Sequence, residues 1–399
     1  MKSEWKKVPI ESLCIGIYDG PHATPPRSDA GGVFLGISNF SNGRLDLSNI
    51  RYISEDDLPK WTKRVTPKAH DIVFSYEATL NLYAIIPEGF YGCLGRRMAL
   101  VRPDESKVDY RFLYYYMYSS QWREEIERHK VNGSTVDRIP LISFPSFTVN
   151  LPSMATQKYI AEVLSVLDDK IKHNNKINDN LEHQAELLYH ERFETVDRDK
   201  LPVGWRIVRL GDVATISKKS FNPAKEPEIL LEHYSIPAFD EAHFPVFELS
   251  TAIKSNKFII DNSCFMISKL NPTTKRVWKP YCLTANAVCS TEFIVYKAKS
   301  QEITNFLYSV IDSASFSDFM CSHVTGSTGS RQRTTPSDTL AFELVLPNAE
   351  EIAEYQGIVS PMFEQIKCNA IENDRLKRLR DSLLPKLMSG EIDVSGIQL

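Results

Sequence analysis

Three short segments carry residue types that could support catalysis, and each departs from the pattern that its chemistry requires. The segment 271–274, Asn-Pro-Thr-Thr, is similar to the motif that holds a flipped adenine in DNA methyltransferases, but it lacks the second proline and the aromatic ring. Gly89, Gly92 and Gly95 do not lead from a strand into a helix, as a nucleotide-binding glycine loop would. The acids of segment 103–107 are adjacent, which leaves no strand turn between them to share a metal ion. We therefore expect no catalytic residues, metal site or cofactor in this chain.

A second group of residues has the chemistry of nucleic-acid contact. Lys, Arg and hydroxyl side chains bind phosphates, whereas Arg, Lys, Asn and Gln read base edges. The leading candidates follow a Gly-Ser-Thr loop that occurs twice, at 133–135 and 326–328. The full set of predicted DNA contacts is His22, Thr24, Arg96, Arg97, Ser134, Thr135, Arg138, Lys218, Lys219, Lys275, Arg276, Ser327, Thr328, Arg331, Gln332 and Arg333.

Each of these candidates also has a plainer interpretation. A cluster of basic side chains is often ordinary solvated surface, and a Gly-Ser loop can serve only to cap the next strand. The proline-rich loop 19–26, which contains His22 and Thr24, can equally be a structural loop.

Length, charge and cysteine content restrict the class of protein. A chain of 399 residues implies two or three domains, each large enough to bury a core without disulfides. The net charge of −4 argues at first sight against a polyanionic partner, but acids concentrate in residues 157–194 and 350–393, which leaves the remainder net basic. The seven scattered cysteines form no C-x-x-C pair, and no signal peptide or 18-residue apolar run occurs. We expect a cytoplasmic protein with reduced, mostly buried thiols.

The chain repeats itself at an offset of about half its length. Trp5-Lys6-Lys7-Val8 matches Trp205-Arg206-Ile207-Val208, and the Gly-Ser-Thr loops and two Leu-Pro pairs recur in the same order. Such a repeat indicates one fold used twice, with insertions confined to loops.

Each repeat predicts a globule of mixed strands and helices followed by a long helix. Runs with β signals occur at 32–37 and 258–267. Short strands are expected at 71–75, 147–151, 264–268 and 342–346, and single helices at 110–130 and 302–323. We predict an α+β fold with two similar globules separated by a two-helix antiparallel coiled coil. The predicted boundaries are 1–152 for the first globule, 153–197 for the central helix, 198–347 for the second globule and 348–399 for the C-terminal helix.

Both long helices carry a heptad stripe with asparagines at matching positions. The stripe runs from Ile160 to Leu188 in steps of four and three, and it recurs 195 residues later except at Arg380. Polar seam residues fix register at some cost in stability, so we assign this role to Asn174, Asn178, Asn369 and Asn373. In an antiparallel pair, the midpoints of the two stripes place Asn174 against Asn369.

The length of the stripe suggests a spacer. Its 28 steps span roughly 42 Å at 1.5 Å per residue. Two related readers held at that distance could dock on segments about one turn of B-DNA apart, since one turn is roughly 34 to 36 Å. The early loops of the two globules differ, which indicates that each reads a different short sequence and that the target is bipartite and asymmetric.

The order of several segments resembles a known family. In this order, with the repeat and the heptads, occur Trp5 to Leu13, the loop 19–26, Leu151-Pro152 followed by 157–193, Leu201-Pro202-Val203-Gly204-Trp205, and 383–390. Over essentially its whole length the chain is therefore similar to the specificity (S) subunits of type I restriction-modification systems.

The resemblance implies two target recognition domains, each of which reads half of a split DNA site, and conserved helices that dock two methyltransferase (M) subunits. S-adenosylmethionine is then expected on the M subunits, and ATP and magnesium on restriction (R) subunits. The assembled complex would be an adenine-N6 DNA methyltransferase and ATP-dependent endonuclease, while this subunit is non-catalytic. We expect the apolar anchors for the M subunits to be Tyr189, Phe193, Leu384 and Leu387. An autonomous DNA methyltransferase or nuclease and a protein-only coiled-coil scaffold are the alternatives.

Overall fold

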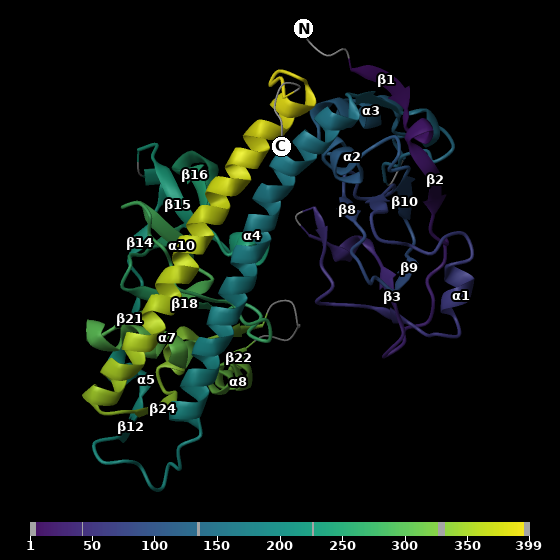
Figure 1. Ribbon diagram of the computed structural model, residues 1–399. Coiled ribbons are helices and arrows are strands. Elements are labelled where there is room, and N and C mark those ends of the chain that lie inside the picture. Colours follow the sequence, from purple (N-terminus) through teal and green to yellow (C-terminus); the bar gives the residue numbers. More distant parts are fainter. Residues whose placement is uncertain (1–4, 42, 134–135, 226, 326–331, 395–399) are drawn as a thin grey trace. The chain divides into compact units, whose positions relative to one another are not determined.

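The computed structural model describes residues 5–41, 43–133, 136–225, 227–325 and 332–394. The chain forms two compact units. Unit 1 comprises Met1–Lys170 with Leu376–Leu399, and unit 2 comprises Ile171–Arg375. Each unit therefore holds one globule together with part of each long helix (Figure 1), so the contacts divide the chain within the helices and not at the ends of the globules.

The globule of unit 1 is built around a four-stranded antiparallel sheet. Its strand order is β2 (Cys14–Asp19), β10 (Met98–Pro103), β7 (Ile72–Ser75) and β8 (Tyr83–Ile85). A second sheet has the order β6 (Tyr52–Ile53), β3 (Gly32–Leu35) and β9 (Gly92–Leu94), with β3 and β9 parallel. Two pairs complete the strands: β1 (Lys6–Pro9) with β11 (Thr148–Leu151), and β4 (Phe40–Ser41) with β5 (Arg44–Leu45). A single helical turn, α1, covers Leu58–Trp61.

The globule of unit 2 repeats this plan. Its four-stranded sheet has the order β13 (Ala214–Ser217), β21 (Phe293–Ala298), β18 (Cys264–Ser268) and β19 (Val277–Trp278). Its second sheet has five strands in the order β14 (Ser220–Phe221), β17 (Lys257–Ile259), β20 (Ala287–Ser290), β15 (Leu230–Tyr234) and β16 (Val246–Leu249). The pairs are β12 (Arg206–Arg209) with β24 (Glu343–Leu346), and β22 (Val324–Thr325) with β23 (Arg333–Thr334). The short helices are α5 (Leu210–Val213), α6 (Ile236–Ala242) and α9 (Pro336–Thr339).

The internal repeat is thus present strand by strand. The order β2-β10-β7-β8 in unit 1 corresponds to β13-β21-β18-β19 in unit 2, and the parallel pair β3 and β9 corresponds to β15 and β20. The short strand expected at 264–268 is confirmed as β18, and the run 258–267 also includes part of β17, which belongs to a different sheet. A turn separates them, in which the Ser263 N–H donates to the Asp261 carboxylate at 3.0 Å.

The two expected globule helices are each broken by a serine. The first is α2 (Tyr110–Tyr116) and α3 (Ser120–His129), and the second is α7 (Thr304–Asp312) and α8 (Ala314–Ser322). The hydroxyls of Ser119 and Ser313 cap α3 and α8 by accepting a backbone N–H three residues later, from Trp122 and Phe316. Because the apolar spacing continues through each break, the periodicity of the apolar residues predicted one helix where the structure has two.

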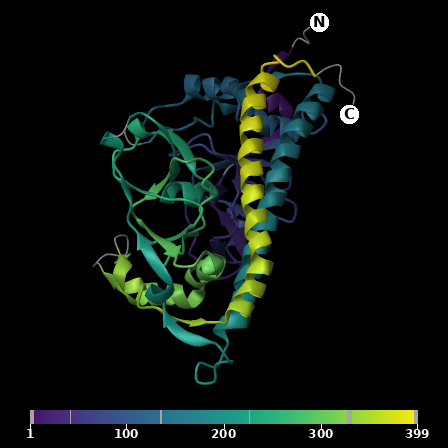
Figure 2. The same ribbon diagram turned by 90° about the vertical axis from the view of Figure 1, so that its left-hand side faces the viewer.

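The two long helices complete the core of each unit. They are α4 (Met154–Tyr189), which continues as a π-helical turn to Glu194, and α10 (Ala349–Met388). In unit 1 the start of α4 packs with the end of α10, through Ile160 and Leu387. In unit 2 the end of α4 packs with the start of α10, through Tyr189 and Tyr355. The helices therefore run antiparallel in each unit (Figure 2). Among the described residues no helix has both the length and the apolar character needed to span a membrane.

Each globule is anchored to these helices by polar contacts as well as by its core. In unit 1 the Tyr115 hydroxyl donates to Asp168 at 2.7 Å, and Arg111 lies 3.3 Å from Glu162. In unit 2 the Asn305 amide donates to the Ser360 hydroxyl at 2.7 Å. The helix surface that faces each globule is therefore specified by hydrogen bonds, which hold the globule in one orientation on its own part of the helices.

The seam asparagines meet, but not in the predicted pairs. Asn174 donates to Asn373 at 2.9 Å, and Asn369 donates to Asn178 at 2.8 Å, so the expected contact between Asn174 and Asn369 is wrong by one helical turn. The midpoint argument placed equivalent residues of the two repeats opposite each other. A local two-fold axis that passes between two layers instead pairs the first asparagine of one helix with the second of the other, as observed.

All seven cysteines fall within the described residues and are free thiols. Three of them are buried, three are half-buried, and Cys368 is exposed. Burial raises the pKa of Cys14 and of Cys93 to about 12, which leaves these thiols protonated and unreactive at neutral pH.

The asparagine layer makes a stability prediction. Asn174→Leu alone removes the donor to the buried Oδ1 of Asn373, so it should lower the free energy of unfolding by about 1–3 kcal/mol. Asn174→Leu combined with Asn373→Leu removes both polar groups and should recover most of that loss. Urea unfolding followed by circular dichroism measures both. A double variant less stable than either single variant would contradict the pairing.

Candidate nucleic-acid interface

Three segments that are distant in the sequence meet at the end of β7 in unit 1. The Tyr76 N–H donates to the Arg97 carbonyl at 3.1 Å, and the Ile139 N–H donates to the Tyr76 carbonyl at 2.7 Å. The Ala78 N–H donates to the Asp137 carbonyl at 3.2 Å. These bonds join the end of β7, the turn before β10 and the segment 137–139, where Arg138 forms an isolated bridge.

The same contact is built in unit 2 at the end of β18. The Lys269 N–H donates to the Glu292 carbonyl at 2.9 Å, and the Thr334 N–H donates to the Lys269 carbonyl at 3.1 Å. The Asn271 N–H donates to the Gln332 carbonyl at 3.0 Å. Each donor and acceptor lies 193 to 195 residues after its counterpart in unit 1. We call this three-segment contact the loop junction: residues 76–78, 97 and 137–139 in unit 1, and 269–271, 292 and 332–334 in unit 2.

The loop junction holds side-chain-bearing residues in a conformation that L residues rarely adopt. Ala78 has a φ of 72° and its counterpart Asn271 a φ of 48°, and Arg97 has a φ of 71°. Such a left-handed residue costs about 1–2 kcal/mol unless it is glycine, so the surrounding hydrogen bonds must offset that cost. Strain kept at equivalent positions of both units points to a functional requirement at this place.

An arginine–glutamate pair lies at each loop junction, but the charges come from different positions. In unit 1 the Arg97 Nε lies 3.0 Å from the Glu77 carboxylate. In unit 2 Arg333 is bound by both oxygens of Glu292, at 3.0 and 3.2 Å. Glu292 is the counterpart of Arg97 and Arg333 the counterpart of Arg138, so the two units present opposite charges at the same place.

Two predicted contacts are used inside unit 2 instead. The Lys275 ammonium lies 2.9 Å from Asp312 and 3.5 Å from Glu186. The Arg276 guanidinium is bound by both oxygens of Asp240, at 2.5 and 2.9 Å. Because carboxylates already neutralise both cations, the structure argues against the prediction of DNA contact for these two residues.

Other predicted cations are exposed and make no ion pair within the part of the chain that the structure describes: Arg96, Arg138, Lys218 and Lys219. His22 is 66% exposed, with its Nε2 3.3 Å from Asp19, and Thr24 is exposed in the same loop. Ser134, Thr135, Ser327, Thr328 and Arg331 lie outside the described residues, whereas Gln332 is half-buried in the loop junction. Within the described ranges no group of three or more His, Cys, Asp or Glu side chains is arranged to hold a metal ion.

Comparison with known proteins gives matches to one domain family and to relatives of similar length. Residues 2–183 match the family model described as a type I restriction modification DNA specificity domain. Two curated specificity subunits of type I restriction enzymes match along most of the chain. The chain thus contains a match to this specificity domain and is similar to type I specificity subunits along most of its length.

The relatives are similar in extent as well as in sequence. The MjaIX specificity subunit of Methanocaldococcus jannaschii is 26% identical, over 88% of this chain and 86% of the relative. The HindI specificity subunit of Haemophilus influenzae is 24% identical, over 90% and 94%. A crystal structure of an S subunit from M. genitalium superposes with a TM-score of 0.59 at 15% identity, over 97% and 96%, which shows a shared fold.

The side chains predicted as apolar anchors for partner subunits are buried or partly buried in their own units. Tyr189, Phe193 and Leu387 are 5%, 3% and 2% exposed, and Leu384 is partly buried against the core of unit 1. Tyr189 and Phe193 pack on Phe306 and Tyr355 of their own unit. The prediction failed because it treated each helix as one side of an isolated pair, whereas the globules cover these positions.

Two functional features escaped the reasoning from sequence. The first is the glutamates of the loop junction, Glu77 and Glu292, which orient the arginines. An alignment of the repeats places Glu292 on Arg97, and this charge reversal could have drawn attention to both positions. The second is Arg51, which donates to the Pro25 carbonyl at 2.5 Å and stacks over Phe34, and so holds the proline-rich loop. No local sequence motif indicates that Arg51 holds the proline-rich loop.

The unpaired lysines of unit 2 provide a test. Lys218→Ala with Lys219→Ala should lower the slope of log affinity against log salt by up to about 1.8, since each lost phosphate contact removes about 0.9. Fluorescence anisotropy with a duplex in a salt series measures the slope. Lys297→Ala is the matched control, because Lys297 already pairs with Asp261 and should leave the slope unchanged. Equal effects from both variants would remove these lysines from the interface.

Proposed function

We propose that the chain recognises a split, asymmetric DNA target as the specificity subunit of a type I restriction-modification complex, with one half-site read by each unit. The observation that carries this proposal is the duplicated loop junction. Each globule brings the same three segments together, one of which follows a Gly-Ser-Thr segment in the sequence, and the side chains at equivalent places differ. One scaffold with two sets of reading residues is what two unlike half-sites require.

Differences between the globules support two unlike half-sites. The second sheet has three strands in unit 1 and five in unit 2, so a larger surface is available in unit 2. At the loop junction, an arginine in one unit corresponds to a glutamate in the other. Arginine favours guanine, whereas a carboxylate accepts a hydrogen bond from the amino group of cytosine. Specificity can therefore change at one position while the backbone that presents it stays the same.

The long helices supply the proposed spacing. The polar contacts of Arg111 and Tyr115 in unit 1, and of Asn305 in unit 2, attach each globule to its own part of α4 and α10. The asparagine layer fixes the register of the helices in unit 2. A fixed register and fixed attachments would hold the number of base pairs between the half-sites constant.

Catalysis belongs to other subunits in this proposal. Specificity subunits are non-catalytic, and this chain carries a specificity domain. We propose that S-adenosylmethionine binds to the M subunits, and ATP and magnesium to the R subunits, when these assemble with the chain on DNA.

A methylome tests the function directly. Sequencing of methylated DNA from cells with and without the gene should show the loss of one adenine-methylation motif, composed of two unlike specified parts and an unspecified spacer of constant length. The matched control is a strain in which the intact gene is restored, which should recover the motif. A contiguous or palindromic motif would contradict reading by two unlike units.

We further propose that the M subunits dock on the open side of the helices. Four apolar side chains there remain between 37% and 54% exposed: Val166 and Leu187 on α4, and Ile358 and Leu379 on α10. On each helix the two residues are 21 positions apart, which is three heptads. The two residues on α4 occupy heptad position c, and the two on α10 occupy position g. The helix residues that bind the globules, such as Asp168 and Ser360, occupy positions b, e and f. Val166, Ile358 and Leu379 are thus exposed apolar residues at heptad positions that do not bind the globules, whereas Leu187 also lines a pocket beside α7 and α8.

The docking proposal predicts a separation of two activities. The double variant Ile358→Asp and Leu379→Asp should abolish co-purification with a co-expressed M subunit, because each substitution places a charge in an apolar contact. Binding of duplex DNA by the chain should be retained. Pull-down and anisotropy measure the two properties. Val203→Asp, which changes an apolar residue that is 96% exposed and lies outside the helices, is the control. Unchanged co-purification of the double variant would contradict this surface.

A further inference from the structure

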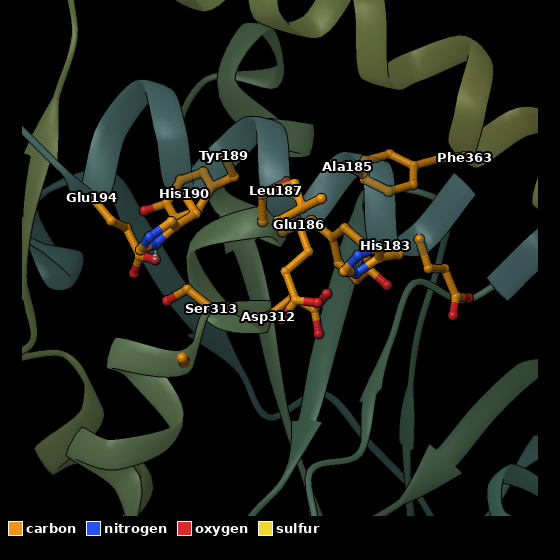
Figure 3. A pocket seen from close by; sticks show the side chains of 14 residues that line it. His183, Ala185, Glu186, Leu187, Tyr189, His190, Glu194, Asp312, Ser313 and Phe363 are labelled. Carbon is orange, nitrogen blue, oxygen red and sulfur yellow. Dashed lines mark hydrogen bonds and ion pairs between the residues drawn. The ribbon is translucent and has the colours of Figure 1, made fainter. Parts of the chain in front are cut away.

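Unit 2 contains a pocket of about 260 Å³ between the end of α4 and the corner of α7 and α8. Figure 3 shows the side chains that line it, with Glu186 and Asp312 directed toward one another and Ala185 near Phe363. Tyr308 also lines the wall. The pocket therefore combines aromatic walls with carboxylates.

The internal repeat explains why this space is open. Ala185 has as its counterpart Arg380, 195 residues later and at the same heptad position. In unit 1 the Arg380 guanidinium fills the corresponding place, with Nη1 2.7 Å from Asp168 and Nε and Nη2 3.0 and 2.8 Å from Asp381. In unit 2 the equivalent position carries only the methyl group of Ala185.

The residues around the two positions correspond as well. Glu186 is the counterpart of Asp381, and Phe363 is the counterpart of Asp168, each at an offset of 195. Asp312 precedes the capping Ser313 as Tyr118 precedes the capping Ser119, so these two are also equivalent. Unit 2 thus keeps one acid of the Arg380 site and gains another at a new place, but it lacks the guanidinium.

The acidic side chains of the pocket are only partly neutralised. Lys275 approaches Asp312 and Glu186 at 2.9 and 3.5 Å, and His190 pairs with Glu194 at 2.9 Å. No ion pair to Glu182 occurs within the described residues, although it lines the same pocket. Burial, with the neighbouring charges of Asp312 and Asp179, raises the pKa of the Glu182 carboxyl to about 7. A further cation in the pocket would reduce the electrostatic repulsion among these carboxylates.

We propose that the pocket binds a guanidinium group supplied by another molecule, at the place that Arg380 fills in unit 1. A planar guanidinium can bind the carboxylates of Glu186 and Asp312 through two edges and lie against an aromatic ring of the wall. The group would come either from an arginine of a partner protein or from a free alkylguanidine, and both share this chemistry. The proposal does not depend on the DNA target or on the M subunits.

The test is a titration of the full chain with two probes, agmatine and the blocked peptide acetyl-Gly-Arg-Gly-amide, followed by calorimetry. Saturable binding of one equivalent is expected for at least one probe. Tighter binding of the peptide identifies a protein partner as the source, and tighter binding of agmatine identifies a free alkylguanidine. Absence of saturable binding by both probes would overturn the proposal.

Variants locate the binding in the pocket. Ala185→Arg supplies the missing group from the chain itself, so it should abolish probe binding and raise the melting temperature. Ala252→Arg adds the same charge at an exposed alanine of unit 2 and should leave binding unchanged. Glu182→Gln should weaken binding by about tenfold without removing a contact of the fold, which keeps the test valid if Ala185→Arg fails to fold. Binding that is equal in the wild type and in either pocket variant would overturn the assignment.

Discussion

The loop junction is the constraint on which the proposed DNA-reading surface depends. Backbone hydrogen bonds at the end of one central strand tie together two segments that lie tens of residues away. Because the bonds involve main-chain groups, most side-chain substitutions leave them in place. They also offset the cost of left-handed residues such as Ala78 and Asn271. The backbone therefore sets the place of residues 137–139 and 332–334, and the side chains at the loop junction are free to differ.

The comparison of the two units shows how that freedom is used. Arg97 and Glu292 occupy equivalent positions with opposite charge, and each forms its ion pair with a partner from a different segment. The same pattern appears at the helices, where Arg380 and Ala185 are equivalent and only unit 1 has an arginine inside. In both cases a change of side chain leaves the four-stranded sheet unchanged, since its strand order corresponds in the two units.

Reasoning from the sequence recovered the architecture more fully than the site. The repeat, the strand content and the antiparallel helices follow from periodicity, which reports directly on buried faces. To predict the asparagine pairs, one must know where the local two-fold axis lies relative to the two asparagine layers. To predict the helix breaks at Ser119 and Ser313, one must recognise an N-cap, which apolar spacing does not reveal.

At the site, the limitation was the pairing of charges. The sequence indicates that Lys275 and Arg276 are basic, but their carboxylate partners come from α4, α6 and α7, which only the fold brings close. Tyr189 and Phe193 illustrate the reverse case: they have the character of interface anchors, but the packing of the globule uses them first. Exposure depends on tertiary contacts, so residue type alone could not decide it.

The first and last strands of each globule form a pair of their own. β1 is antiparallel to β11, and β12 is antiparallel to β24, so the chain enters and leaves each globule at neighbouring points. A segment whose ends are adjacent can be exchanged for another of the same kind without moving the scaffold to which it is attached. New recognition sequences could in this way arise by recombination of whole cassettes, which would spare the helices the many compensating substitutions that a gradual redesign would demand.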